Sequence, residues 1–157
     1  MTISNTSIKR RLERLLFVEA QIYTIAKEIE TIGKTSKEVM SLFGIHGCGM
    51  LTASAIVTEV VTVRRFADKH HFSMYAGVVP IPHSSGRHNK MNTNPFGNRK
   101  LNKALHCIAL SQIAIKGDPI GRDYYKRKLG EGKTKLWALR CLKHQIAKVV
   151  YQKLKHA

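Results

Sequence analysis

The sequence has few acidic residues: its 157 residues include 10 Asp and Glu against 27 Lys and Arg, a formal net charge of +17. The imbalance lies in residues 69–157, which carry 18 basic and 3 acidic side chains, whereas residues 1–68 carry 9 and 7. Such an excess predicts a polyanionic partner, because Lys and Arg bind nucleic acids by neutralising phosphates. A membrane surface would require an amphipathic helix with aromatic residues opposite its cations, and the single Trp137 does not provide one. We therefore expect nucleic acid, and no membrane, as the partner.

Long apolar runs and paired cysteines are also missing. No apolar segment approaches the roughly 20 residues of a membrane-spanning helix, and the first residues do not have the layout of a signal peptide. The three cysteines, Cys48, Cys107 and Cys141, are odd in number and include no Cys-x-x-Cys pair. This pattern favours reduced thiols over a disulfide framework or a zinc site. We expect a cytoplasmic protein whose chain itself binds no metal or cofactor.

Proline and glycine are few, at 4 and 11 residues, and leave long segments of helical periodicity between them. No segment has a convincing strand pattern, so the sequence predicts an all-α fold. The expected helices cover residues 8–32, 36–42, 50–61, 68–75 and 98–116, a short segment after Pro119, and residues 134–155. We divide the chain into a coiled-coil helix, residues 1–34, and a helical domain, residues 35–157.

The first expected helix has a heptad repeat. Its a positions are Ile8, Leu15, Ile22 and Ile29, and its d positions are Arg11, Val18, Ile25 and Ile32. Seven of these eight residues are apolar, which is typical of a short coiled-coil seam. An amphipathic helix packed on its own domain explains so short a seam almost equally well. The coiled-coil interpretation predicts a homo-oligomer held together by residues 8–32.

A short turn with two glycines, Gly47 and Gly49, separates the second and third expected helices. Glycine permits positive φ and close approach of another backbone, and the free N–H groups that open residues 50–61 can bind a phosphate oxygen. The turn therefore resembles a helix-hairpin-helix element, whose contact with DNA is blind to sequence. A turn whose glycines serve only packing is the alternative interpretation.

Proline, glycine and small polar residues predict a long irregular loop over residues 79–98. The loop contains Ser84-Ser85-Gly86, and the basic residues within and after it are Arg87, Lys90, Arg99, Lys100 and Lys103. A serine among cations, with no carboxylate nearby, suits an anionic phosphodiester better than an acyl substrate. On this chemistry alone, a solvated basic loop that touches nucleic acid is the favoured interpretation, since Ser-Gly pairs are common.

Basic residues also mark the last helices. The helix over residues 98–116 begins with Arg99, Lys100 and Lys103, whose charge opposes the positive end of the helix dipole. A phosphate bound there would make them tolerable, so we expect a DNA contact at this end. The last helix has an apolar stripe: Leu136, Leu139, Leu142, Ile146, Val149 and Leu154. Its basic residues lie mostly away from this stripe: Arg140, Lys143 and Lys148.

Several short segments occur in the order found in a known family: Gly47-Cys-Gly-Met-Leu-Thr-Ala53, Arg65-Phe66, Tyr75-Ala-Gly-Val-Val-Pro80, Ser84-Ser-Gly86, Phe96-Gly-Asn-Arg99, Lys103-Ala-Leu105 and Asp118-Pro119. Together they resemble the C-terminal transposase domain of the IS110 family, insertion-sequence recombinases guided by a bridge RNA. The resemblance covers residues 43–151, and the helix before it resembles the family's coiled coil.

The resemblance implies that the serine directly before glycine, Ser85, attacks a DNA phosphodiester and forms a transient phosphoserine link. Such a link conserves bond energy and divides strand exchange into two easier steps. On chemical grounds, Arg87, Lys90 and Arg99 are candidates for stabilising the charge of the phosphorane. The other expected DNA-binding residues are Gly47, Gly49, Lys100 and Lys103.

The family's N-terminal RuvC-like domain, whose four acidic residues hold divalent metal such as Mg²⁺, has no counterpart in residues 1–42. We therefore expect a truncated or split copy that requires a RuvC-like partner for catalysis. Its expected partners are double-stranded DNA and a guide RNA, and the resemblance implies association with a bacterial or archaeal nucleoid. The alternative is a non-catalytic nucleic-acid-binding module, or a regulator of a full-length transposase. A basic RNA-binding protein unrelated to transposition is a third possibility.

Overall fold

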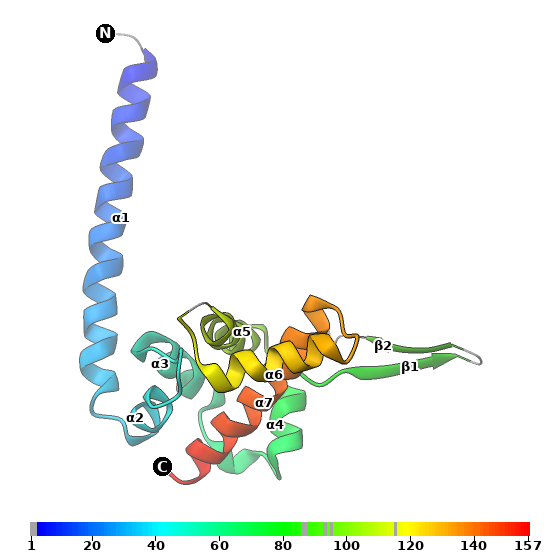
Figure 1. Cartoon of the computed structure of the whole chain (residues 1–157). Helices are drawn as coiled ribbons and strands as arrows, with labels where there is room; N and C mark the ends of the chain where they lie inside the picture. Colours follow the sequence, from blue (N-terminus) through cyan, green and yellow to red (C-terminus); the bar gives the residue numbers. More distant parts are fainter. Residues whose placement is uncertain (1–2, 86–87, 93, 95, 115) are drawn as a thin grey trace.

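The computed structural model describes residues 3–85, 88–92, 94, 96–114 and 116–157, with side chains for residues 6–81, 94, 96–114 and 116–157. Helices form the whole body of this part of the chain (Figure 1), so the predicted all-α fold class is confirmed. In order, the elements are α1 (Ile3–Gly33), α2 (Lys37–Phe43), α3 (Met50–Val60), the short 3-10 helix η1 (Val63–Arg65), α4 (Lys69–Tyr75), β1 (Ile81–Ser85), β2 (His88–Asn92), α5 (Arg99–Ile113), α6 (Pro119–Gly130) and α7 (Lys135–Lys155).

Polar residues fix where most of the helices begin. Each accepts a hydrogen bond from backbone N–H groups of the following first turn, which have no partner within the helix. These capping residues are Ser36, Asp68, Asn98, Asp118 and Thr134, before α2, α4, α5, α6 and α7. The predicted starts of α4, α5 and α7 are the capping residues themselves, one residue before the observed starts.

The core lies among the central helices, mainly around α5 and α7. α5 packs against α3, α6 and α7, and α7 also contacts α2, α4 and η1. Removing apolar side chains from water is the main favourable term in folding. The largest fully buried apolar side chains come from five of these helices: Leu42, Ile56, Phe72, Leu101, Leu105, Ile108 and Val150.

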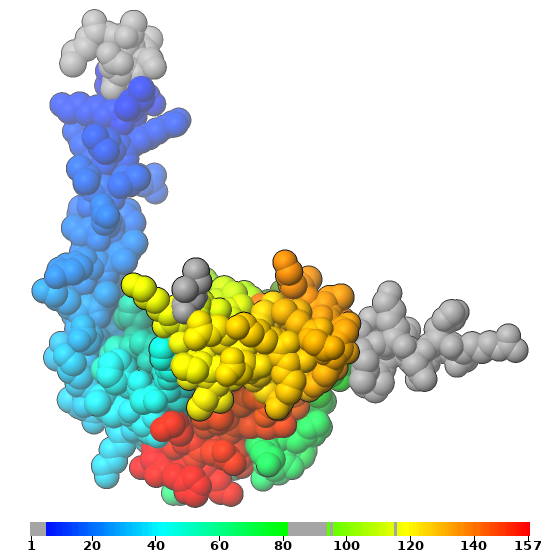
Figure 2. All heavy atoms as spheres, viewed as in Figure 1, coloured from blue at the N-terminus to red at the C-terminus, as the bar shows by residue number. Residues whose placement is uncertain are grey.

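α1 stands apart from the body over most of its length (Figures 1 and 2). Its main contact is with α3, close to its C-terminal end, where Ala26 and Ile29 are half-buried. Farther from the body, the seam is exposed, for example Leu15 at 60% and Ile22 at 62%. Among the described residues, this part of the seam is therefore not covered by the chain's own domain.

Residues 79–98 differ from the irregular loop that the sequence predicts. β1 and β2 form an antiparallel hairpin in which Ser85 pairs with His88. Between these paired ends the sequence has two residues, Gly86 and Arg87, and a glycine that opens a two-residue connection is a typical hairpin sequence. Pro82 is compatible with β1 because both strands of a two-stranded hairpin are edges. The hairpin extends away from the helical body (Figure 1), so no apolar alternation is needed in its strands.

Candidate functional site

The hairpin is anchored where the chain leaves α4 and enters α5, in residues 75–80, 94 and 96–98, which we call the hairpin foot. Gly77 and Gly97 lie so close there that a side chain on Gly97 would overlap the backbone of Gly77. Gly77 also has a positive φ of 66°, a conformation that glycine adopts without strain. The two glycines therefore let the entering and leaving segments cross in direct backbone contact.

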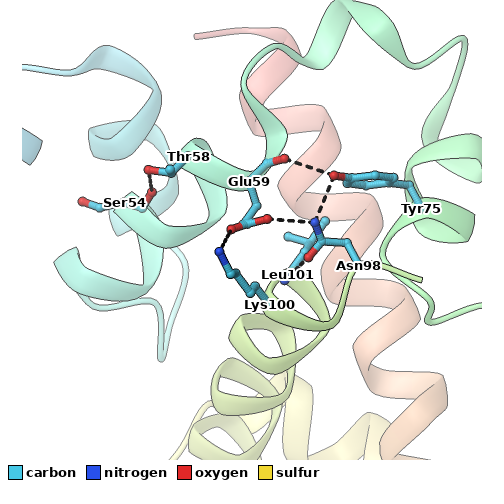
Figure 3. A network of polar contacts seen from close by, with 7 residues as sticks. All are labelled: Ser54, Thr58, Glu59, Tyr75, Asn98, Lys100 and Leu101. Carbon is cyan, nitrogen blue, oxygen red and sulfur yellow. Dashed lines mark hydrogen bonds and ion pairs between the residues drawn. The ribbon is translucent and has the colours of Figure 1, made fainter. Parts of the chain in front are cut away.

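Glu59 of α3 ties the hairpin foot to the start of α5 (Figure 3). Its carboxylate accepts a hydrogen bond from the Asn98 amide at 2.8 Å and forms an ion pair with Lys100 at 3.1 Å. The Tyr75 hydroxyl donates to the Glu59 carbonyl at 3.3 Å and accepts from the Asn98 amide at 3.0 Å. The hydrogen bonds from Asn98 and Lys100 hold the pKa of Glu59 below its ordinary value. Glu59 is thus an anion that orients the residues at the start of α5.

A pocket of about 550 Å³ opens between the hairpin foot, α5 and α7, and we call it the basic pocket. In the described part of the chain, none of its lining residues is Asp or Glu. Trp137 forms part of its wall, and the Arg140 guanidinium lies over the Trp137 ring, 4.9 Å from the centroid. Its basic side chains come from both helices: Arg99, Lys103 and His106 from α5, and Arg140 and Lys143 from α7.

Lys143 is the most buried cation of the basic pocket, with 9% of its surface exposed. Its ammonium donates to Oδ1 of Asn102 at 2.7 Å. The Asn102 amide in turn donates to two backbone carbonyls of the hairpin foot, at 2.9 and 3.1 Å. Burial lowers the pKa of Lys143, and the nearby charge of Arg140 lowers it further. The pocket therefore holds a desolvated cation in direct connection with the hairpin foot.

The structure brings together only part of the predicted DNA-binding set. Arg99 and Lys103 line the basic pocket, whereas Lys100 forms its ion pair with Glu59. Three predicted site residues are not fully described. Arg87 lies outside the described residues. The backbones of Ser85 and Lys90 belong to β1 and β2, but their side chains lie outside the described part of the chain.

The turn between α2 and α3 gives its two glycines different environments. Gly47 has a φ of 81°, and a Cβ on it would lie 2.7 Å from the Cβ of Ser111 in α5. Gly49 is the N-cap of α3, makes no side-chain capping bond, and has open space around its Cα. Packing thus accounts for Gly47, while the N–H groups that open α3 have no side-chain cap at Gly49. A DNA contact at this turn stays a prediction.

The donor set around the hairpin foot does not fit a divalent metal. The described residues contain no cluster of three or more His, Cys, Asp or Glu that could hold a metal ion. The carboxylate of Glu59 is engaged by Asn98 and Lys100, and the basic pocket presents cations.

The described part of the chain includes no helix with both the length and the apolar composition that crossing a membrane requires.

The sequence prediction that Lys143 lies away from the apolar stripe of the last helix is wrong. α7 packs against α2, α4, α5 and α6, so a wide arc of its circumference is buried. Lys143 falls within this arc, three residues before buried Ile146, whereas Leu136 of the predicted stripe is 67% exposed. The spacing of Lys143 from Ile146 is the sequence feature that points to its burial.

The sequence profile described as the transposase IS116/IS110/IS902 family matches residues 39–126 of this chain. The match covers more than half of the chain, including the hairpin, its foot and α5. The chain belongs to this family. The resemblance drawn from the short sequence motifs is therefore confirmed at the level of the IS110 family.

Two insertion-element proteins match the IS110-family chain over most of its length. The IS900 uncharacterized 42 kDa protein of Mycobacterium paratuberculosis is 25% identical over 155 residues, which are 98% of this chain and 38% of that protein. The IS116 uncharacterized 44.8 kDa protein of Streptomyces clavuligerus is 27% identical over 143 residues, 90% of this chain and 35% of that protein. A probable family 20 transposase of Pseudomonas aeruginosa is 27% identical over 74 residues, 47% of this chain and 22% of that protein. The chain thus spans less than two-fifths of the length of each relative.

Proposed function

We propose that this chain is the DNA-binding, serine-bearing part of an IS110-family transposase that acts in DNA transposition. The observation that carries the proposal is the position of the hairpin. The strand ending at Ser85 starts from a foot beside the basic pocket, whose lining has several cations and, in the described part of the chain, no carboxylate. Family membership supports the reaction class, and the charge of the pocket supports a phosphodiester as the bound group.

In this proposal the Ser85 hydroxyl attacks a DNA phosphodiester. A bond forms between the serine oxygen and phosphorus, and the bond from phosphorus to one deoxyribose oxygen breaks. Serine loses a proton and the leaving oxygen takes one up. Because one phosphorus–oxygen bond replaces another, the phosphoserine link is again a phosphodiester, and another deoxyribose hydroxyl can attack it and release the serine. The cations proposed to stabilise the charge of the phosphorane are Arg87, Lys90 and Arg99.

We assign divalent metal to a separate RuvC-like partner domain, because the described residues of this chain include no cluster that could hold a metal ion. The guide RNA is a further proposed partner. This chain then contributes the nucleophile and binds double-stranded DNA. The proposed DNA-binding groups are Lys103 in the basic pocket and the uncapped N–H groups after Gly49. Without the partner domain, the chain is expected to form no covalent link to DNA.

A second copy of this chain is the proposed partner of α1. The seam exposed along α1 repeats every 3.5 residues, the spacing that another helix with the same repeat can match. Arg14 is at position g and Glu19 at the following position e, and in a parallel pair these positions face each other across the seam. Both the exposed apolar residues and this charge pattern favour a parallel coiled coil.

The second candidate function is that of a non-catalytic regulator, which would bind DNA and pair through α1 with a full-length transposase. The exposure of the α1 seam favours this function as much as self-association. Both candidates require DNA binding, and they differ in whether Ser85 reacts.

DNA binding itself is tested by fluorescence anisotropy with a labelled duplex at increasing salt concentrations. Because Lys and Arg side chains displace condensed cations, affinity should fall at least about tenfold between about 50 and 200 mM salt. Several unrelated duplex sequences should bind with similar affinities, since phosphate contacts carry no sequence information. A binding constant that is insensitive to salt would contradict the proposed grip on the phosphate backbone.

A further inference from the structure

We propose that the basic pocket binds a single phosphate group of nucleic acid, with Lys143 as its innermost contact. The identification of nucleic acid as the source of the phosphate rests on the proposed function. The phosphate site itself is inferred from the geometry and charge of the pocket.

The charge of the pocket lining is unbalanced. Four Lys and Arg side chains and His106 face one cavity, and no acidic residue among the described lining residues offsets them. Glu59, whose carboxylate is hydrogen-bonded to Asn98 of the hairpin foot, neutralises Lys100, which is not a lining residue. Like charges that share a cavity repel one another, and an anion placed between them removes that repulsion.

Lys143 has unused hydrogen-bonding capacity. An ammonium group has three protons to donate, and among the described residues Lys143 donates one hydrogen bond, to Asn102. A buried charge without an opposite charge is costly, yet this lysine is 9% exposed and lines a cavity. Phosphate oxygens would accept hydrogen bonds from the remaining N–H groups of Lys143 and supply the missing negative charge.

Hydrogen bonds connect the pocket to the hairpin. Asn102 accepts from Lys143 and donates to the carbonyls of Ala76 and Gly77 in the hairpin foot. A phosphate held by Lys143 would therefore fix the nucleic acid relative to the strands that start from this foot. The site would position the backbone for the residues of the hairpin, without taking part in bond exchange itself.

Trp137 is the only tryptophan of the chain and lies in the wall of the pocket, so its fluorescence reports directly on occupancy. The experiment titrates the full chain with inorganic pyrophosphate and, separately, with a short DNA duplex. Both should change the Trp137 emission. Lys143→Met should weaken both interactions about tenfold or more, the value of a charge-assisted hydrogen bond.

Lys148→Met is the matched control, because it removes the same charge from the same helix at a position that does not line the pocket. Its affinities should stay within about twofold of the wild type, since one distant charge contributes weakly in salt. Lys103→Gln is a second pocket variant at an exposed side chain, so its fold does not depend on tolerance of a core substitution. Circular dichroism melting of each variant checks the fold.

The outcomes separate this inference from the proposed function. If the wild type binds the duplex but Lys143→Met and Lys103→Gln bind it as tightly as Lys148→Met does, the pocket inference is overturned and DNA binding stands. If pyrophosphate changes the Trp137 emission, Lys143→Met weakens this effect, and no nucleic acid binds, the phosphate site stands and the proposed function fails. If neither probe changes the emission or binds, both are wrong.

Discussion

Gly47 and Gly49 are two residues apart, yet the structure predicts opposite effects for their substitution. Gly47→Ala should destabilise the fold by about 1–3 kcal/mol, because alanine resists positive φ and its Cβ would meet Ser111. Gly49→Ser should keep or raise stability, because a serine at this N-cap can accept from the first N–H groups of α3. The same hydroxyl would compete with a phosphate for these donors. Gly49→Ser should therefore weaken DNA binding.

Chemical denaturation measures the stability of both glycine variants, and anisotropy with a labelled duplex measures their affinity. A Gly47→Ala protein as stable as the wild type would refute the packing role of Gly47. If the Gly49→Ser protein binds DNA with undiminished affinity, the start of α3 does not bind phosphate.

Two half-buried histidines make the stability of the fold dependent on pH. Burial is the main cause that lowers the pKa of His106 and of His144 below 6.5, and nearby cations add to it: Lys143 for His106, and Lys148 and His70 for His144. The unfolded chain therefore binds more protons just below pH 6.5, and stability is lost as the pH falls through this value.

Thermal melting at about pH 7.5 and about pH 5.5 tests this prediction. The wild type should melt at a lower temperature at the acidic pH, and His144→Gln should reduce the difference, since glutamine does not ionise. Equal wild-type melting temperatures at the two pH values would show that these histidines do not govern acid stability.

At the scale of elements, the helices can be predicted because residues next to their ends determine where they begin. Asp68, Asn98 and Thr134 are polar N-caps, and the sequence predicts the starts of their helices to within one residue. The hairpin was missed because it extends into solvent and so lacks the alternation that a buried face imposes. Its one local sign, Gly86 at the start of a two-residue connection, is too short to outweigh the surrounding prolines.

The exposed seam of α1 predicts self-association through this helix. Leu15→Lys combined with Ile22→Lys places two charges at a positions, and the product should be a folded monomer. Both residues are largely exposed in the single chain, so the substitutions should not disturb the body. The measurement is sedimentation velocity over a range of protein concentrations.

The matched control introduces lysines at f positions of the same helix, Glu13→Lys and Ala20→Lys, which point away from a coiled-coil partner. This protein should associate like the wild type. A wild-type chain that sediments as a monomer at high concentration would rule out self-association through α1.

At the scale of the whole molecule, composition predicts the kind of partner, but it cannot locate the site. The charge of residues 69–157 is visible in the sequence. The basic pocket, however, depends on contacts between residues far apart in the chain, such as Asn102 and Lys143. Only packing decides that Lys103 faces this pocket while Lys100 pairs with Glu59. A sequence prediction that treats these adjacent cations alike cannot separate them.

The central claim is that this chain contributes Ser85 as the nucleophile of a transposase. The measurement is the formation of a protein–DNA adduct on a nicked substrate that traps the intermediate. The mixture contains this chain, divalent metal, and the RuvC-like domain and guide RNA of an IS110-family transposase. Protease treatment should release the DNA, and mass spectrometry should place the link on Ser85.

The wild-type chain alone should form no adduct, and the complete mixture should form one that Ser85→Ala abolishes and Ser84→Ala largely retains. An adduct that survives Ser85→Ala but not Ser84→Ala would move the nucleophile to the neighbouring hydroxyl. A complete mixture that binds DNA and forms no adduct with any of these proteins would contradict the central claim and leave this chain as a DNA-binding module.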